Sequence, residues 1–348
     1  MTKKALIVSP YLDHLGGGER YMLSIASVLE SLGHDVYFAW DNLEEISKLS
    51  LMLGLNLKNP GLDRKVKDLY FKGNAFSMYL ATKPYDLVVY LSDGSIPMLG
   101  GRRNILHMQV PFHGVHGTSI QNKIKQMFVH KVIVNSEFTK KIVDEEYGLS
   151  SVVLYPPVTP INCAKPKEKL ILSVGRFEPS LNAKKQDSLI EAMRLLSTQL
   201  PDWRLALAGG SSSDEWLNSL KSKATGLPIT FYPNATHEEL CNLYGKSQIY
   251  WHAAGYGIDE SKNPELTEHF GISTVEAVSA GCIPLVVPYG GQREIVKSPD
   301  LHWESVAELV QKTKAVIANP TKSSYLENIV ISDYSVDNFA LNFGKLIV

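Results

Sequence analysis

Short apolar runs alternate with longer amphipathic stretches from the first residues of the chain. Residues 5–9 (ALIVS) are apolar up to a final serine, which is typical of a strand buried on both faces of a parallel sheet. Apolar side chains then recur at helical spacing in residues 19–33, and residues 36–40 (VYFAW) form a second apolar run. A strand, a helix and a strand in this order predict the βαβ unit of an α/β domain.

The alternation continues along the chain with one break. Before the break, strands are predicted at residues 86–92, 104–110, 131–136 and 151–158, with a helix at 137–148. Residues 159–169 (TPINCAKPKEK) are polar, contain two prolines and have no periodicity, so they predict a linker. Beyond it, strands are predicted at 170–175, 204–210, 229–234, 249–254 and 283–287, with helices at 186–200, 215–224, 236–247 and 305–319.

This organisation predicts two doubly wound, Rossmann-like α/β domains that face each other across a cleft. We place the first domain at residues 1–160 and the second at 161–330, and we expect a C-terminal helix in 331–348 to cross back to the first domain. A chain of 348 residues exceeds the usual size of one hydrophobic core. Ligands of such domains bind beyond the carboxyl ends of the strands, so the site is expected there.

Composition narrows the class of protein. A net charge of −1 gives no reason to expect nucleic acid as a partner, and 44% hydrophobic residues are typical of a soluble globular protein. No apolar run approaches the roughly 20 residues that cross a bilayer. The three cysteines have no metal-type or redox-type spacing, which allows a reducing compartment. We therefore expect a cytoplasmic protein, or one that only touches a membrane.

Three successive glycines follow the first strand, in the stretch PYLDHLGGGER. Glycine lets the backbone approach a ligand, and a helix that starts there offers N–H groups to an anion. Gly17 and Gly18 are therefore candidate ligand contacts, although a tight turn needs the same residues. The dinucleotide fingerprint G-x-G-x-x-G is not matched, because Tyr21 stands where its last glycine would, and the Walker pattern is absent. An NAD-dependent enzyme is accordingly disfavoured.

Cations follow the first strand of the second half. Arg176 closely follows this strand in the stretch SVGRFEP, and Lys184 and Lys185 come next in a polar loop before a helix. Positive side chains at the carboxyl end of a parallel strand point into the ligand site of an α/β domain and suit a phosphate. An ordinary solvated loop has the same composition.

Two glutamates bracket the start of a helix in the stretch TEHFGISTVEAVSAGCIPLVV. Ser273 and Glu276 have the spacing of a capping box, so Glu276 has a structural explanation. Glu268 lies outside the helix and has none. A carboxylate is a strong acceptor for sugar hydroxyls, and the N–H groups of Gly271 and Ile272 at the helix start suit a phosphate. Each glutamate is therefore a candidate contact for a different polyol, with a phosphate site between them.

Histidines and metal motifs carry less information. His107 ends an apolar strand, where a core histidine is the ordinary interpretation. The sequence has no H-E-x-x-H, C-x-x-C or D-x-D motif. A bound diphosphate would therefore be neutralised by Arg176, a lysine and helix N-termini rather than by Mg²⁺. No metal is expected.

Taken together, these stretches resemble glycosyltransferase family 4, retaining sugar-nucleotide transferases with the two-domain GT-B fold. The stretch EHFGISTVE at 268–276 matches that family's E-x7-E motif, and residues 277–286 match the A-x-x-A-G-x-P-x-V that follows it. VGRF with a downstream lysine matches its phosphate-binding Arg/Lys pair. GGGER, LHMQVP, VNSEFT and YPPV look most like the α-1,2-mannosyltransferases of lipid-linked oligosaccharide assembly. The resemblance spans nearly the whole chain.

The resemblance implies roles for most of the candidate residues. Glu276 would hydrogen-bond the ribose of the donor nucleotide, and Glu268 would hold hydroxyls of the transferred sugar close to the anomeric carbon. His107 would contact the donor sugar and a phosphate oxygen. Gly17 and Gly18 would bring backbone N–H groups to the diphosphate from the first domain.

For the cations, the resemblance implies that Arg176 and Lys185 stabilise the leaving diphosphate. The interval RFEPSLNAKKQD is longer than the family's usual spacing, which leaves Lys184 and Lys185 hard to separate; KQD before a helix favours Lys185. Breaking the sugar–phosphate bond builds positive charge on the sugar and negative charge on the diphosphate. Preorganised cations and helix N-termini stabilise that transition state more than the ground state.

The resemblance thus implies a retaining hexosyltransferase that needs no metal or other cofactor. It would move a hexose, expected to be mannose from GDP-mannose, to a glycan or lipid-linked acceptor. No second carboxylate in the motifs is an evident nucleophile, which fits a front-side route in which the leaving phosphate assists deprotonation of the acceptor. Three alternatives stay open: a UDP-sugar-dependent glucosyl or GlcNAc transferase of the same family, a nucleotide-sugar epimerase, and a non-catalytic sugar-nucleotide-binding protein of GT-B fold.

One basic segment bears on the acceptor. Residues 60–142 carry twelve Lys/Arg and five Asp/Glu, a local charge of +7 in a chain of net −1. The stretches DRKVKDLYFKG and NKIKQMFVHK mix these cations with aromatic and aliphatic side chains. Such a surface is typical of contact with anionic lipid, worth about 1 kcal/mol per cation, although a solvated helix face has the same composition. We expect peripheral contact with the cytosolic face of an anionic membrane.

Overall fold

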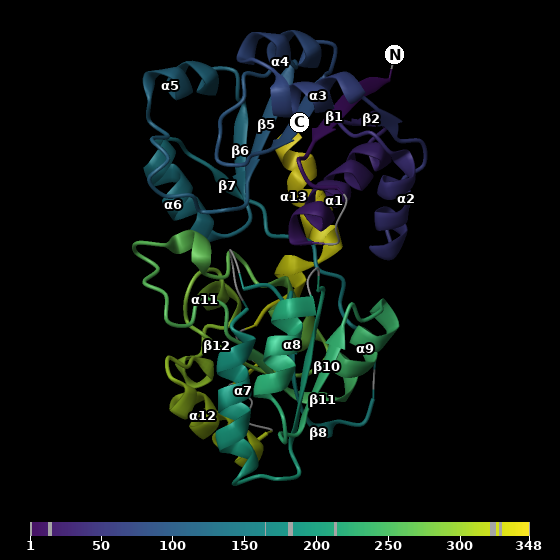
Figure 1. Ribbon diagram of the computed structural model, residues 1–348. Helices are drawn as coiled ribbons and strands as arrows, with labels where there is room; N and C mark the ends of the chain where they lie inside the picture. Colours follow the sequence, from purple (N-terminus) through teal and green to yellow (C-terminus); the bar gives the residue numbers. More distant parts are fainter. Residues whose placement is uncertain are drawn as a thin grey trace. The chain divides into compact units, whose positions relative to one another are not determined.

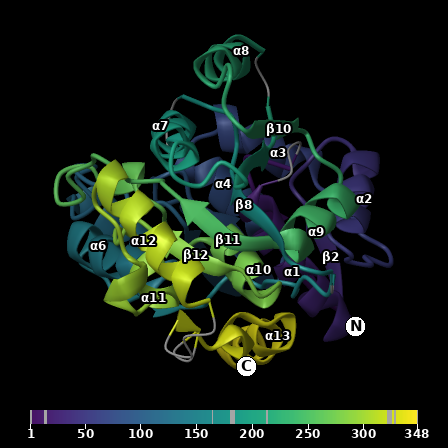
Figure 2. The same ribbon diagram turned by 90° about the horizontal axis from the view of Figure 1, so that it is seen from below.

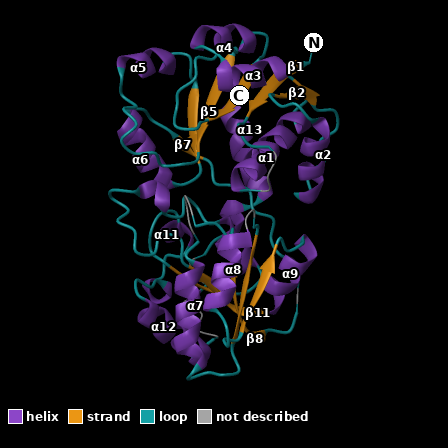
Figure 3. Cartoon of the chain, in the orientation of Figure 1, coloured by secondary structure: helices purple, strands orange, loops and turns teal. Residues whose placement is uncertain are grey.

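The computed structural model describes residues 2–12, 16–163, 165–179, 184–211, 214–320, 325–326 and 329–347. The chain divides into two compact units (Figure 1). Residues 1–157 with 336–348 make up unit 1, and residues 158–335 make up unit 2. Each unit is built around one parallel sheet with helices on its faces (Figure 3), which confirms the predicted pair of Rossmann-like domains.

Unit 1 contains a seven-stranded sheet in the order β3-β2-β1-β4-β5-β6-β7, with parallel neighbours throughout. Its strands are β1 (Lys3–Val8), β2 (His34–Phe38), β3 (Gly61–Leu62), β4 (Leu87–Leu91), β5 (Arg103–Met108), β6 (Lys131–Val134) and β7 (Val152–Val153). The strand order reverses between β1 and β4. Doubly wound α/β sheets bind ligands at such a switch point. In this chain the switch point lies next to the glycines that follow β1.

Both faces of this sheet are buried, because successive side chains of a strand point to opposite faces. The helices of unit 1 are α1 (Gly17–Ser31), α2 (Leu43–Met52), α3 (Arg64–Lys72), α4 (Ala75–Thr82), α5 (Ile120–Gln126), α6 (Glu137–Tyr147) and α13 (Val336–Ile347). Ala5 and Ile7 pack in one core cluster with α1, α2 and α13, whereas Leu6 and Val8 pack in another with α3, α4 and α6. Burial on both faces explains why the strands are apolar without alternation.

Unit 2 contains a five-stranded parallel sheet in the order β10-β9-β8-β11-β12. Its strands are β8 (Glu168–Val174), β9 (Arg204–Gly209), β10 (Ile229–Pro233), β11 (Ser247–His252) and β12 (Ile283–Val286). Its helices are α7 (Gln186–Ser197), α8 (Asp214–Lys223), α9 (His237–Lys246), α10 (Ile272–Ser279), α11 (Gln292–Ile295) and α12 (Val306–Ala318), with 3₁₀ turns η1 (Pro264–Leu266), η2 (Pro299–Leu301) and η4 (Ile331–Tyr334).

The helices of unit 2 cover both faces of its sheet. In Figure 2, α7 and α12 lie on one side of the strands, and α9 and α10 lie on the other. Leu243 of α9 and Ala277 of α10 share a core cluster with Leu172 of β8. On the α12 side, Trp251 of β11 donates its indole N–H to the hydroxyl of Thr313 over 3.1 Å. The strands that carry the candidate residues are therefore packed against helices on both faces of the sheet.

Candidate active site

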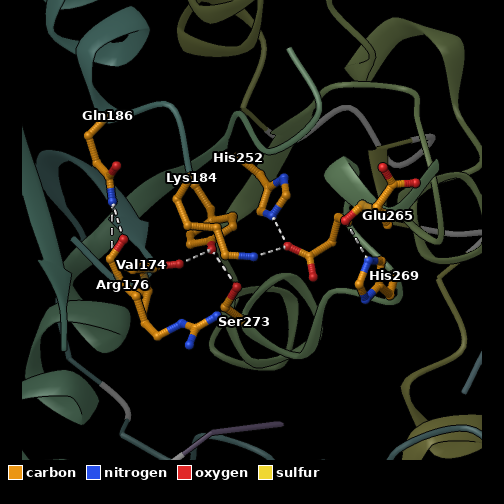
Figure 4. Close-up of polar contacts among 11 residues, drawn as sticks. Val174, Arg176, Lys184, Gln186, His252, Glu265, His269 and Ser273 are labelled. Atoms are coloured by element: carbon orange, nitrogen blue, oxygen red, sulfur yellow. Dashed lines mark hydrogen bonds and ion pairs between the residues drawn. The ribbon is translucent and has the colours of Figure 1, made fainter. Parts of the chain in front are cut away.

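The candidate site lies at the carboxyl ends of β8, β11 and β12, which are neighbours in the sheet of unit 2. Arg176 comes two residues after β8, and His252 is the last residue of β11. The segment that begins at Gly290 follows β12. Parallel α/β domains bind their ligands at this edge. Figure 4 shows the polar contacts among the residues here.

Glu268 is held by two donors that meet on the same oxygen atom. Nζ of Lys184 lies 2.6 Å from Oε2 of Glu268, and Nε2 of His252 lies 2.9 Å from that same Oε2 (Figure 4). The exposed fractions of the Lys184, Glu268 and His252 side chains are 17%, 12% and 3%. Within the described ranges, no residue hydrogen-bonds Oε1. One carboxylate oxygen is thus held by two donors, and the other has no hydrogen-bond partner among the described residues.

This pairing keeps Glu268 ionised. Burial alone would raise the pKa of its carboxyl, but the charge of Lys184 and the hydrogen bond from His252 outweigh burial and hold that pKa well below its usual range. Burial lowers the pKa of His252, and Glu268 only partly opposes this. His252 is therefore neutral near pH 7 and donates from Nε2. Its buried Nδ1 is then an acceptor that no described residue uses.

Lys184 reaches Glu268 because the loop after β8 leaves room for its side chain. A Cβ atom on Gly175 would lie 2.6 Å from Cγ of Lys184, so a larger residue would obstruct the lysine. Gln186, buried at the start of α7, donates Nε2 to the carbonyl oxygens of Gly175 (3.3 Å) and Arg176 (2.9 Å). These bonds attach the backbone after β8 to the N-terminus of α7. They thereby fix the backbone from which the side chains of Arg176 and Lys184 extend.

The structure distinguishes the cations that the sequence left close together. The Arg176 side chain is exposed and points toward Ser273 at the start of α10 (Figure 4), and no described residue pairs with its guanidinium. Lys184 contacts Glu268. Lys185 is instead the N-cap of α7, with a left-handed φ of 51°, and its ammonium has no partner in the described part of the chain. These contacts place Lys184, and not Lys185, beside the candidate carboxylate.

The predicted capping box of Ser273 and Glu276 is wrong. The N-cap of α10 is Gly271, with φ of 116°, and no side chain caps this helix. Ser273 is already the second helical residue, and its Oγ lies 2.8 Å from the Tyr250 hydroxyl. Oε2 of Glu276 accepts a hydrogen bond of 3.0 Å from the hydroxyl of Tyr244. Glu276 therefore does not serve as the capping carboxylate that its spacing suggested.

Gly271 and Ile272 begin α10, as the proposed phosphate contacts require. A Cβ atom on Gly271 would lie 2.3 Å from Nε2 of Gln292, whose side chain is fully buried. The N–H of Gly291 donates to the carbonyl oxygen of Glu268 over 2.8 Å. The glycines after β12 thus lie directly against the backbone between Glu268 and α10, and they fix both the carboxylate and the helix start.

The glycine candidates of unit 1 also lie at a helix start. α1 begins at Gly17 after the N-cap Gly16, and no side chain of the described residues caps it. A Cβ atom on Gly18 would lie 2.6 Å from Nε2 of Gln109. The side-chain amide of Gln109, the residue after β5, therefore packs closely against Gly18.

His107 is fully buried in the core of unit 1. Its ring stacks on Tyr21 at a centroid distance of 3.9 Å, and its Nδ1 lies 3.2 Å from the carbonyl oxygen of Ile133. Burial lowers its pKa to about 3. This geometry is that of a core histidine, and it leaves no exposed surface for a donor sugar. The implied role of His107 in donor binding stays a prediction.

Two contacts were not predicted from the sequence. His252 was assigned only to a strand, and Lys184 was ranked below Lys185. A signal for His252 existed, because it ends an apolar strand, where α/β domains place functional side chains. No such signal separates two adjacent lysines in a polar loop.

Neither a metal site nor a membrane span is found in the described residues. No group of His, Cys, Asp and Glu side chains there could hold a metal ion. None of the helices in the described ranges combines the length and the apolar character needed to cross a bilayer.

Two family models match the chain. The one described as Glycosyltransferase Family 4 matches residues 15–160. The one described as Glycosyl transferases group 1 matches residues 160–330. Between them they span almost all of both units.

Two curated relatives carry the same name, GDP-Man:Man(3)GlcNAc(2)-PP-Dol alpha-1,2-mannosyltransferase. The protein from Caenorhabditis elegans is 28% identical over 222 residues, which cover 58% of this chain and 43% of the relative. The protein from Xenopus laevis is 28% identical over 179 residues, which cover 47% of this chain and 35% of the relative. The chain thus matches less than half the length of these relatives.

Solved glycosyltransferase structures share the fold. A glycosyltransferase from Rickettsia africae ESF-5 superposes with a TM-score of 0.71 at 17% identity, over 99% of this chain and 98% of the other. TarM gives a TM-score of 0.73 at 12% identity, over 100% and 99%. The pneumococcal O-GlcNAc transferase GtfA, solved with UDP and GlcNAc, gives 0.66 at 12% identity, over 99% and 98%. These likenesses show that the chain has the GT-B fold. The two family models show that it is a glycosyltransferase made of a Glycosyltransferase Family 4 domain and a Glycosyl transferases group 1 domain.

Proposed function

We propose that the protein transfers a hexose from a sugar nucleotide to a glycan or lipid-linked acceptor. The observation that carries this proposal is the state of Glu268, an ionised carboxylate with one oxygen tied by Lys184 and His252 and the other open. It lies next to the start of α10, on the same strand edge as Arg176. Mannose from GDP-mannose is the proposed donor, because both curated relatives are named for GDP-Man. UDP-sugars are the alternative, since GtfA was solved with UDP.

The donor would lie along this strand edge of unit 2. Glu268 would accept hydrogen bonds from hydroxyls of the transferred sugar, and Glu276 from those of the ribose. Arg176 and Lys184 would stabilise the diphosphate, together with the N–H groups at the start of α10. We assign Lys184 in place of Lys185, because its Nζ already lies 2.6 Å from Glu268. Gly17 and Gly18 of unit 1 would add N–H groups from the start of α1.

The proposed reaction retains the configuration of the sugar and uses no metal. The bond between the anomeric carbon and the phosphate oxygen breaks, and the acceptor oxygen bonds to that carbon on the same face. The acceptor proton passes to the leaving phosphate. Negative charge grows on the diphosphate as the bond breaks, so Arg176 and Lys184 bind the transition state more tightly than the ground state.

A binding panel tests the donor. GDP, UDP and ADP with their hexose derivatives are added to the protein, and the shift in melting temperature is measured without metal and with EDTA. A ligand that binds only the folded state raises stability by mass action, so we expect the largest shift with GDP and GDP-mannose. A larger shift with UDP would reassign the donor base, and no shift with any nucleotide would contradict the proposed site.

Variants of Glu268 test the chemistry. With the donor from the panel, E268Q and E268A are expected to lower turnover by about a thousandfold, the scale of losing a group that stabilises the transition state. The matched control is E191Q, because Glu191 is an exposed carboxylate on α7 that pairs only with Arg194 in the described structure. Turnover near that of the wild type in both Glu268 variants would refute the assignment.

We also propose that α5 contacts the cytosolic face of an anionic membrane. Ile120, Ile124 and Met127 are 79%, 52% and 83% exposed, and Lys123 and Lys125 lie among them on the same helix. An exposed apolar face mixed with cations is typical of a helix that lies in a membrane interface. Such contact would bring the protein to a lipid-linked acceptor.

Vesicle binding tests this surface. The double variant I120S/M127S should sediment less with vesicles of phosphatidylcholine and phosphatidylserine at low salt than the wild type does. The control is L51S, since Leu51 is 75% exposed on α2 but lacks a basic helix around it. Equal sedimentation of the wild type and the double variant would exclude α5 as the contact.

A further inference from the structure

We propose that His252 is a positioning residue that holds Glu268 in place for the sugar while Lys184 turns to the diphosphate. This inference rests on the proposed function and adds a residue to its site. His252 carries no role in the family resemblance described above. It is placed by its contact with Glu268, at the end of β11.

Lys184 cannot serve Glu268 and a diphosphate fully at the same time. Its Nζ lies 2.6 Å from Oε2 of Glu268. A diphosphate carries more negative charge than a carboxylate and competes for the same ammonium. The lysine stem has four rotatable bonds, so Nζ turns toward a new partner at low cost. After Lys184 has turned, the hydrogen bond from Nε2 of His252 still holds Oε2 of Glu268.

His252 is buried and lies in the interior of the sheet. Its backbone belongs to β11, where it pairs with Val286 of β12 in the interior of the sheet. Its side chain is 3% exposed, and its ring lies tilted 6.5 Å from that of Tyr250. Because Nδ1 has no partner in the described residues, the polar contact of this ring goes to Glu268 alone. In the described structure, the His252 ring thus makes one hydrogen bond, to Glu268.

A neutral imidazole orients the carboxylate without neutralising it, whereas a second cation would weaken its hold on the electron-poor sugar. Glu268 therefore keeps its charge when Lys184 leaves, with Oε2 still bonded and Oε1 facing the sugar. Without His252, Oε2 of Glu268 would lose its second donor, and the carboxylate would move with Lys184.

Kinetics of three histidine variants test the proposal. H252A should lower kcat about ten- to a hundredfold, the value of a hydrogen bond to a charged group, while the affinity for the nucleoside diphosphate stays within about twofold. H252Q carries an amide N–H near the position of Nε2 and should restore kcat to within about threefold of the wild type. The control is H302Q, because the His302 ring lies in the same unit and, in the described structure, hydrogen-bonds the carbonyl oxygen of Val296 and none of the candidate residues.

The outcomes separate positioning from a structural role. If H252A and H252Q both match the wild type, His252 positions nothing. If both lose nucleotide affinity and thermal stability together, the role is structural and the proposal is overturned. Loss in H252A with recovery in H252Q, at unchanged nucleotide affinity, supports it.

A second measurement does not depend on turnover. In ¹⁵N-histidine spectra, the signal that disappears in H252Q should report an Nε2–H tautomer near pH 7, and E268Q should shift it. A protonated ring or an Nδ1–H tautomer would overturn the proposal. If this signal behaves as expected but no sugar nucleotide binds or reacts, the proposed function fails while the contact stands.

Discussion

At the scale of single residues, the buried His107 gives unit 1 a defined response to acid. His107 stacks on Tyr21 and has no exposed surface, and burial lowers its pKa to about 3. In the unfolded chain a histidine has a pKa of about 6.5. Above that pH both states are neutral at this residue. Below it the unfolded state takes up a proton that the folded state does not, so acid favours unfolding.

Because of His107, we expect the free energy of unfolding of unit 1 to fall by about 1.4 kcal/mol for each pH unit as the pH is lowered from about 6.5 to about 3. Hydrogen exchange of peptides from β1 and β5 at pH 7, 6 and 5 measures this free energy. H107N keeps a donor for the carbonyl of Ile133 but does not titrate, so its free energy should change less with pH. An identical pH slope in the wild type and H107N would contradict the assignment.

Some residues of the candidate site could be predicted from the sequence, and others could not. Glu268 could be found, because a carboxylate outside a helix between apolar stretches has no structural explanation. The sequence favoured Lys185 as the lysine of the site, whereas Lys184 makes the contact with Glu268. The choice depends on a turn in which Lys185 takes a left-handed φ of 51°, and the sequence does not show this turn. A contact between His252 and Glu268 across 16 residues depends on packing that no local pattern encodes.

At the scale of elements, the segment after β12 determines how Glu268 and α10 are held. Gly290 has φ of 63°, and a Cβ atom there would lie 2.0 Å from the carbonyl oxygen of Glu268. The Gly290 N–H donates to Oε2 of Glu260 over 2.8 Å, and Arg293 pairs with the same carboxylate. This segment is therefore fixed at both of its ends against the chain that carries Glu268.

G290A is expected to destabilise the protein and to lower turnover, because the new methyl group displaces the Glu268 backbone. The matched control is G257A. Gly257 has a similar φ of 73°, but a Cβ atom there meets nothing within 4 Å, so only the left-handed backbone costs energy, about 1 kcal/mol. Thermal melting and turnover of both variants measure the difference. Equal effects in G290A and G257A would show that the close approach is unimportant.

The hydrophobic pattern of the sequence predicted the strands that are buried on both faces of a sheet. The strands that form the centres of the two sheets are continuous apolar runs, and each was expected within a few residues of its observed bounds. The helices at 43–52, 64–72 and 75–82 were not assigned. α3 is strongly basic and α4 is only eight residues long, so neither has the sustained apolar stripe that identifies a helix.

At the scale of the whole molecule, the chain ends in the core of unit 1 after completing unit 2. α13 belongs to unit 1, and its Phe339 and Phe343 share a core cluster with residues of β1 and α1. Phe339 lies edge-on to Tyr21 at a centroid distance of 5.2 Å. Tyr21 in turn stacks on His107, so the last helix closes the packing around that histidine.

F343A is expected to lower the free energy of unfolding of unit 1 by about 3–5 kcal/mol, because it removes a fully buried ring and leaves a cavity. Hydrogen exchange of peptides from β1 and α1 measures the loss. The control is L341A on the same helix, because Leu341 is 58% exposed and its truncation removes little buried surface. If F343A and L341A protect these peptides equally, the ring of Phe343 does not belong to the unit 1 core. Loss of protection in F343A alone would show that the packing of α13 stabilises unit 1.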